Sequence, residues 1–391
     1  MTNKEELFGA VDAQKEALWS MNDQIHDNPE YEGNEVFAAG LLTDYLKAHG
    51  FEVEMGVGGY KTAFRGTFQH GEGGPVIGIL TEYDALRGLG HGCGHNLQGP
   101  GCLGAAVALS QLDIPESFRL VVYGTPAEET LGAKADMIKN GCFHELDVAL
   151  MMHGGPNTCT DIKCLAQKSY VVYYYGKGAH AAMNPEKGRS AFDAALAAFN
   201  GVEFLREHVP DDVRLHYTMK ELPGPSNVVP ARAVAEFSAR SFSRTTLESV
   251  CERLLDIFKG AALIAGVDYE AKEGTFFYNK IPVLKLNDIL MKNAELAGAP
   301  QLAPPREKTG STDFGNVMYE IPGCCIRVAF VPEGTPSHSQ AFVDAGKTEA
   351  GHNAVLYGAK AIAGASYDLI RQPELLQAVK DEFAESKKKF G

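Results

Sequence analysis

Short apolar runs alternate with helical segments through the first part of the chain, and this alternation limits the fold more than any other feature. Val76–Leu80, Leu120–Tyr123 and Val148–Met152 are almost wholly apolar, as strands buried on both faces of a parallel sheet are. Small-residue helical segments such as Leu103–Leu109 lie between them. The pattern predicts an α/β domain in which helices flank a central, largely parallel sheet.

Two helices are expected near the ends of the chain. Residues 4–27 carry apolar side chains at helical spacing, which predicts one amphipathic helix. A final helix over residues 348–370 is expected to return to the α/β domain, next to a further core strand at Ile326–Phe330.

The pattern changes near Lys168. At 391 residues the chain is long for a single core, so a second domain is expected. Strand and helix signals then follow in the order βαββαβ, which is typical of a ferredoxin-like α+β sandwich. They cover residues 169–175, 190–207, 214–219, 234–240, 246–265 and 267–272. We therefore predict an α/β domain formed by residues 1–167 and 279–391, with an inserted domain at residues 168–278.

Charge and composition restrict the partners. The formal net charge of −14 disfavours nucleic acids and anionic membranes. The N-terminal residues lack the basic and apolar regions of a secretory signal, and no run reaches the ~18 apolar residues of a membrane span. The eight cysteines have no regular spacing and are expected to be reduced. A cytoplasmic protein that acts on a small molecule is expected.

The segment Gly90-His91-Gly92-Cys93-Gly94-His95-Asn96 follows the first buried strand and precedes the small-residue helix. Loops at the carboxyl ends of strands are where α/β proteins place their chemistry. Cys93 and His95 are ligands that suit zinc and other transition metals, and glycines beside them permit unusual backbone angles. A purely structural glycine-rich turn, with a buried cysteine and a capping histidine, would have the same sequence pattern. This pair alone therefore leaves both interpretations open.

Glu128 and Glu129 directly follow the strand that ends near Tyr123. Adjacent carboxylates repel unless a cation lies between them. At a metal centre one could bind the metal while the other takes a proton from water. The alternative is an acidic first turn of a helix, which the helix dipole favours.

Two further histidines occupy similar places. His153 follows the apolar run that ends at Met152, and His338 lies after the strand at Ile326–Phe330. Each alone would more often be structural. Candidate ligands nevertheless recur after four predicted core strands, which favours a common site at one edge of the sheet.

At this level the sequence resembles the M20 metallopeptidase family of aminoacylases, carboxypeptidases and amidohydrolases. The resemblance covers essentially the whole chain, and its Cys-Gly-His-Asn form is similar to the amidohydrolase branch with aminobenzoyl-glutamate hydrolase-like and dipeptidase-like members. The motifs that carry it are Asp84-Ala85-Leu86, Gly90–Asn96, Pro126-Ala127-Glu128-Glu129, Met152-His153, Gly178-Ala179-His180-Ala181-Ala182, Asn227-Val228-Val229-Pro230, Gly310-Ser311-Thr312-Asp313-Phe314 and Ser337-His338-Ser339.

The resemblance implies two divalent metal ions per subunit, zinc or manganese, and a set of ligands. These ligands are Cys93, His95, Glu129, His153 and His338, with Cys93 bridging the metals. Glu128 would be the general base that activates a water molecule for attack on an amide.

The resemblance also implies roles outside the ligand set. The inserted domain would be a lid and dimerisation domain, and His180 would reach the active site of the partner subunit in a homodimer to stabilise the oxyanion. Asn227 and Arg240 would hold the substrate carboxylate, and Asp84 would orient a ligand imidazole. The substrate implied is an N-acyl amino acid, a dipeptide or an aryl-amide of an amino acid.

Two positions depart from the family pattern. Glu82 stands where many relatives have a ligand histidine and has no assigned role. Arg87 follows Asp84-Ala85-Leu86 where relatives commonly have proline. Arg87 is either a plain surface residue or a cation near the pocket that influences the choice of substrate.

Three alternative functions remain open from the sequence. A hydrolase of the same fold could act on a non-peptide C–N bond, as in aromatic amine deamination. Cys93 could be a covalent nucleophile with His95 as its base. The chain could also be a metal-binding protein without turnover, although the intact Glu128–Glu129 pair argues against this.

Overall fold

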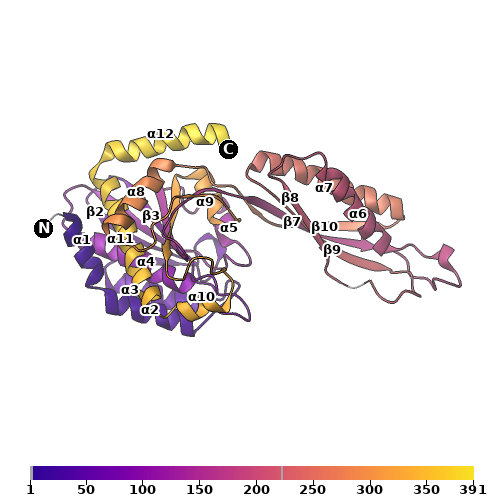
Figure 1. Ribbon diagram of the computed structural model, residues 1–391, viewed down its shortest axis with the longest axis horizontal. Helices are drawn as coiled ribbons and strands as arrows, with labels where there is room; N and C mark the ends of the chain where they lie inside the picture. Colours follow the sequence, from indigo (N-terminus) through magenta and orange to yellow (C-terminus); the bar gives the residue numbers. More distant parts are fainter. Residues whose placement is uncertain (1–2, 222) are drawn as a thin grey trace. The chain divides into compact units, whose positions relative to one another are not determined.

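The computed structural model describes residues 3–221 and 223–391, which divide into two compact units. The first unit contains the described residues up to Cys164 together with Lys280–Phe390, and the second contains Leu165–Asn279 (Figure 1). The predicted boundaries, at 167/168 and 278/279, lie within a few residues of these. None of the helices in the described ranges has the length and apolarity that crossing a bilayer requires.

The first unit is built on a six-stranded sheet with the strand order β1-β2-β4-β3-β5-β12. The neighbours among β3, β4, β5 and β12 pair in parallel, while β1 and β2 join one edge by antiparallel pairing. The largely parallel α/β sheet predicted from the apolar runs is therefore confirmed. The strands are β1 (Glu52–Met55), β2 (Phe64–His70), β3 (Val76–Thr81), β4 (Phe118–Gly124), β5 (Val148–Gly155) and β12 (Gly323–Ala329).

Helices cover both faces of this sheet, because alternate residues of its buried strands point to opposite sides. Along β5, Leu150 packs in the large cluster that includes α4 and α11, whereas Met151 packs in a second cluster with α5 and α9. Figure 1 shows α4 and α11 packed side by side. The helices of this unit are α1 (Asn3–Asp12), α2 (Lys15–Asp27), α3 (Val36–Ala48), α4 (Gln98–Gln111), α5 (Ala133–Lys139), α8 (Leu284–Leu296), α9 (Phe314–Glu320), α10 (Gln340–Ala345), α11 (Glu349–Arg371) and α12 (Pro373–Phe390).

The prediction of one helix over residues 4–27 is wrong, since α1 and α2 are separate. The break falls at Gln14, whose buried amide Nε2 donates to the carbonyl oxygens of Ala10 at 2.9 Å and Gly104 at 3.3 Å. A buried amide requires such partners, and here one acceptor lies in α1 and the other in α4. At the other end of the chain, α11 agrees with the predicted final helix, but a further helix, α12, begins at Pro373, a residue suited to a first helical position.

A small parallel sheet of two strands was not predicted. It pairs β6 (Asp161–Cys164) with β11 (Arg306–Thr309), and Arg306 lies opposite Asp161. β6 alternates polar and apolar residues over only four positions, and β11 has no apolar residue, so neither strand stands out in the sequence.

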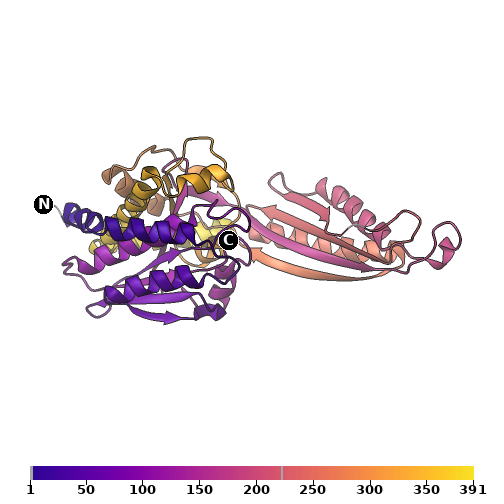
Figure 2. The ribbon, with the colours of Figure 1, turned by 90° about the horizontal axis from the view of Figure 1, so that it is seen from below.

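The second unit has the predicted βαββαβ order and a four-stranded antiparallel sheet, β10-β7-β9-β8. Its two helices pack on one face of the sheet through a separate hydrophobic cluster (Figure 2). This is the ferredoxin-like arrangement expected. Its elements are β7 (Ala166–Tyr175), α6 (Ala191–Arg206), β8 (Arg214–Met219), β9 (Arg232–Ser241), α7 (Arg244–Ala265) and β10 (Asp268–Phe277).

Candidate active site

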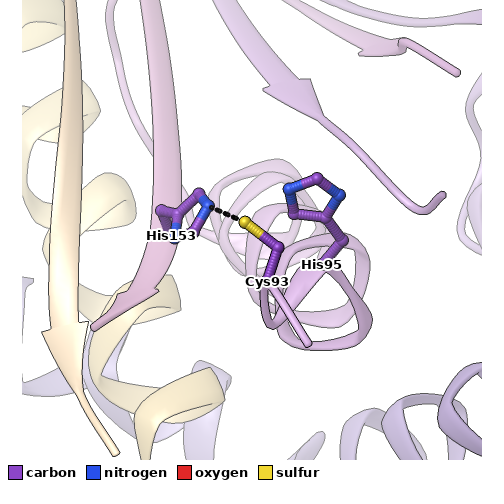
Figure 3. Close-up of side chains that lie close together, drawn as sticks. All are labelled: Cys93, His95 and His153. Atoms are coloured by element: carbon purple, nitrogen blue, oxygen red, sulfur yellow. Dashed lines mark hydrogen bonds between the residues drawn. The ribbon is translucent and has the colours of Figure 1, made fainter. Parts of the chain in front are cut away.

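The turn after β3 brings Cys93 and His95 together. Gly94 lies between them with a φ of 79°, a left-handed conformation that glycine adopts without strain, and His95 begins the short helix that leads into α4. His153 approaches from β5, with its Nε2 atom 3.5 Å from the Cys93 sulfur (Figure 3). The three side chains each offer one ligand atom within 4.8 Å of the others.

The two adjacent carboxylates enter from the loop after β4. Ala127, just before them, has a φ of 56°, which is uncommon for a residue with a side chain. Its carbonyl oxygen accepts hydrogen bonds from the backbone N–H groups of Leu131 and Gly132, which closes the loop tightly. One atom each of Glu128, Glu129 and His95 then lie within 4.8 Å of one another.

His338 completes the set from the loop after β12. Its backbone N–H donates to the Gly92 carbonyl at 2.8 Å, so this loop is attached to the Cys93 turn. Its side-chain Nε2 lies 3.5 Å from Glu129 Oε1, and it forms a further group with Glu129 and Cys93.

The structure therefore gathers all five predicted ligands and Glu128 in one place. Cys93 belongs to both the group with the two buried histidines and the group with Glu129 and His338. Within the described residues, His95 Nε2 and Glu129 Oε1 are buried without a hydrogen-bond partner. Buried polar atoms are normally paired, so these atoms and the thiol form a donor set that fits divalent transition metals.

Asp84 makes the contacts that an orienting residue requires. Its Oδ1 lies 3.1 Å from His95 Nδ1, and its Oδ2 accepts the backbone N–H of Glu129 at 2.9 Å. With Nδ1 held in this way, Nε2 of the imidazole is directed toward the cluster.

Glu82 has a role that the sequence did not reveal. Its Oε1 accepts a hydrogen bond from the buried Lys134 ammonium at 2.5 Å, and the same ammonium donates to Asp313 Oδ1 at 2.7 Å. Gln98 holds the other Glu82 oxygen at 2.8 Å. Burial favours the neutral acid, but Lys134 outweighs it and lowers the pKa of Glu82 to about 2. We call Glu82, Lys134 and Asp313 the buried triad.

Glu128 lies beside the buried triad, with a carboxylate oxygen within 4.8 Å of oxygens of Glu82 and Asp313. Burial, followed by repulsion from these two carboxylates, raises the pKa of Glu128 well above its ordinary value. A carboxyl group with a raised pKa can accept and hold a proton near neutral pH, as a general base must.

Cys93 is poorly suited to act as a nucleophile. Burial raises the pKa of its thiol to about 12, whereas reactive cysteines have a lowered pKa. The sulfur also lies within 4.8 Å of ligand atoms of His153, Glu129 and His338, as expected of a shared ligand. The geometry favours the ligand role over the covalent alternative.

A cavity of about 430 Å³ opens on this cluster. Cys93, Glu128 and His338 line it, together with two arginines that the sequence pattern did not single out, Arg306 and Arg327. Arg87 does not line it; its exposed guanidinium pairs with Glu32 at the surface. Of the two interpretations of Arg87, the structure therefore supports the plain surface residue.

In the second unit, His180 and Asn227 lie on adjacent segments. Ala181 N–H donates to the Asn227 carbonyl at 3.0 Å, and the exposed His180 ring accepts at Nδ1 from two backbone N–H groups. Arg240, with a buried Nε that lacks a hydrogen-bond partner in the described ranges, lies near the far end of β9. β9 begins at Arg232, at the end nearer Asn227, and at about 3.3 Å per residue the strand from Arg232 to Arg240 is roughly 25 Å long. One copy of this unit therefore does not bring the three residues together.

Comparison with known proteins agrees with this geometry. Residues 80–360 match the model of peptidase family M20/M25/M40. The chain belongs to this family. It is 32% identical to the Xaa-Arg dipeptidase of Homo sapiens, with 95% of this chain and 90% of that protein covered. It is 30% identical to one of the subunits of the p-aminobenzoyl-glutamate hydrolase of Escherichia coli, with 95% of this chain and 93% of that protein covered.

Solved structures show the same fold. The aminobenzoyl-glutamate utilization protein of Klebsiella pneumoniae superposes with a TM-score of 0.73 at 19% identity, covering 94% of this chain and 99% of that one. The Bacillus subtilis YXEP protein, a dinuclear metal binding peptidase of the M20 family, gives 0.70 at 19% identity, covering 92% and 99%. Family membership and the gathered donor set together make this chain a metal-dependent amide hydrolase.

Proposed function

We propose that this protein hydrolyses the amide bond of a dipeptide, an N-acyl amino acid or an aryl-amide of an amino acid, using two divalent metal ions. The observation that carries the proposal is the position of Cys93, shared between two groups of ligand atoms. One group would be completed by His95 and His153, and the other by Glu129 and His338.

The donor set supports zinc or manganese. Thiolate and imidazole suit zinc, while the carboxylate admits manganese as well. Bound at these residues, divalent ions would polarise the scissile carbonyl and lower the pKa of a water molecule.

Glu128 is the residue that moves the proton. Its carboxylate would take a proton from the attacking water, hold it because its pKa is raised, and pass it to the departing amine. Asp84 keeps His95 in place, and the buried triad keeps the surroundings of Glu128 fixed while this happens.

A homodimer in which His180 acts on the partner subunit is part of the proposal. The roughly 25 Å between Arg240 and the adjacent His180 and Asn227 exceeds the length of a dipeptide. Two copies of the chain would allow Arg240 of one subunit and His180 of the other to contact the same substrate. His180 would then donate to the oxyanion, while Asn227 and Arg240 would hold the carboxylate.

The names of the two sequence relatives support the substrate class. Both a dipeptidase and a p-aminobenzoyl-glutamate hydrolase cleave an amide next to an amino acid. We also propose a cytoplasmic location, which is supported by the eight cysteines, all of them free thiols in the structure.

Hydrolysis of a library of dipeptides, acyl-amino acids and aryl-amides, after reconstitution with several metals, tests the proposal. We expect turnover of at least one class, and Glu128→Gln should lower kcat by about 10²–10⁴-fold. Metal content measured by mass spectrometry should be unchanged in this variant. Equal activity of Glu128→Gln and the wild type would remove Glu128 as the base, and cleavage of none of the amides would contradict the function.

A further inference from the structure

Two arginines line the cavity because of strand register. In the pairing of β12 with β5, Arg327 lies opposite His153, and in the pairing of β11 with β6, Arg306 lies opposite Asp161. Both guanidinium groups reach Asp161. Arg306 donates to its two oxygens at 2.6 and 3.0 Å, and Arg327 Nε lies 3.4 Å from Oδ2.

Positive charge exceeds negative charge at this wall of the cavity. Burial would raise the pKa of Asp161, but Arg327 and Arg306 hold it below its ordinary value, so the carboxylate is ionised. One carboxylate faces two guanidinium groups. The acidic residues of the cavity, by contrast, lie with the ligand set and the buried triad.

The two guanidinium groups also retain unused donors. Among the described residues, Arg306 Nη1 and Arg327 Nη2 have no hydrogen-bond partner. The side chain of Arg306 is 40% exposed and that of Arg327 is 22% exposed, so both can be reached from the cavity.

Arg327 also lies beside a candidate ligand. Its Nη1 is 3.0 Å from His153 Nδ1, which itself lies 2.6 Å from the Gly154 carbonyl. A group bound by Arg327 would therefore lie close to the ligand set.

We propose that Arg327 and Arg306 bind a second carboxylate of the substrate, in addition to its α-carboxylate. This inference rests on the proposed amide hydrolysis and specifies its substrate as an amide with an acidic side chain or a dicarboxylic acyl group. A carboxylate matches the planar fork of a guanidinium and can pair with it through two hydrogen bonds. A basic side chain at the same place would be repelled.

Matched substrates that differ only in charge test the proposal. On the amine side, N-acetyl-glutamate is compared with N-acetyl-glutamine, and on the acyl side, N-succinyl-alanine is compared with N-succinamoyl-alanine. For the side that faces the arginines, we expect kcat/KM to be about 10- to 100-fold higher for the acid than for the amide. Arg327→Gln should remove this preference, lowering kcat/KM of the acid substrate by about tenfold or more relative to that of the matched amide. The two pairs reveal which side carries the second carboxylate.

Arg65→Gln is the matched control. Arg65 also pairs with one carboxylate, Glu145 at 2.9 Å, and is 31% exposed, but it does not line the cavity. Arg65→Gln should leave the ratio of kcat/KM between acid and amide unchanged in both substrate pairs. If Arg327→Gln fails to fold, the more exposed Arg306→Gln provides the same test.

Binding separates this inference from the proposed function. Calorimetric titration of the metal-loaded protein with N-acetyl-glutamate and N-acetyl-glutamine, and with succinate and succinamate, needs no turnover. A preference for the acid that Arg327→Gln abolishes would support the arginine site even if no amide were cleaved. Equal affinity and equal kcat/KM for acid and amide in every pair would overturn it, as would a variant that weakens both members of a pair equally.

Discussion

Replacing Lys134 by methionine tests the buried triad. The Lys134 ammonium is fully buried, and it donates to Glu82 at 2.5 Å and to Asp313 at 2.7 Å. Methionine has a similar length and no charge. The substitution would therefore leave two buried carboxylates without their cation while changing the packing little.

The magnitude follows from the geometry. At these distances and an effective dielectric constant of about 20, each attraction amounts to about 6 kcal/mol. Desolvation of three charges cancels most of the total, and removal of one partner from such a buried pair typically costs about 3–5 kcal/mol. We expect a loss of that size in the free energy of unfolding of the first unit at pH 7.5.

The loss should depend on pH. In the wild type, the depressed pKa of Glu82, about 2, gives a stabilising contribution that is present above pH 4.5 and disappears only as the pH falls toward 2. Without Lys134, burial raises the pKa of the Glu82 carboxyl instead, and the pKa of Asp313, which burial already raises in the wild type, rises further. The two ionised carboxylates then destabilise the fold at neutral pH, and proton binding removes this destabilisation. The loss in the free energy of unfolding should therefore shrink between pH 7.5 and pH 5, by up to about 1.4 kcal/mol per pH unit for each proton bound.

Urea unfolding followed by tryptophan fluorescence provides the measurement. The chain has one tryptophan, Trp19, which lies in α2, so the signal reports on the first unit. Lys139→Met, at the end of the same helix α5, is the control, because its pair with Asp136 is exposed and should be worth about 0.3–0.5 kcal/mol. A Lys134→Met deficit below about 1 kcal/mol, or one that stays constant between pH 5 and 7.5, would refute the reasoning.

Three further outcomes are expected at the site. Treatment with a chelator should abolish hydrolysis and added metal should restore it, whereas activity that survives metal removal would favour Cys93 as a nucleophile. Asp84→Asn should weaken metal binding by about 10–100-fold, measured by competition with a chromogenic chelator, because Asp84 accepts hydrogen bonds that place both His95 and Glu129; unchanged affinity would remove this orienting role. Arg87→Gln should leave the ranking of substrates in the amide library unchanged, and an altered ranking would return this surface cation to the list of specificity residues.

Most of the candidate site could be predicted because its residues follow a rule of topology. Parallel strands end at the same edge of a sheet, so ligands after β3, β4 and β12 must converge. His153 lies within β5, near its end, and joins them for the same reason. The apolar runs that identify the strands are the strongest signal in the sequence, and the candidate ligands are located by their position at or after the end of each run.

The residues that were missed act through pairs whose members lie far apart in the sequence. Lys134 has no unusual neighbours in the chain, and its importance comes from two carboxylates that reach it from other loops. Arg306 and Asp161 face each other only because two strands of four residues pair. Such strands are fixed by tertiary contacts and not by their own periodicity, so a sequence pattern does not reveal them.

The buried triad connects the stability of the first unit with the chemistry of the site. Glu82 follows β3, Lys134 lies in α5 and Asp313 precedes α9, so the ion pairs join three elements around Glu128. The two carboxylates that help raise the pKa of Glu128 are the same two that Lys134 holds. At a pH where Glu82 and Asp313 remain ionised, loss of the ammonium would therefore increase the negative charge near Glu128, raise its pKa further and leave it protonated at a higher pH. In Lys134→Met the acid limb of the pH–rate profile should consequently move to higher pH, a change that a merely less stable enzyme with an unaltered Glu128 would not show.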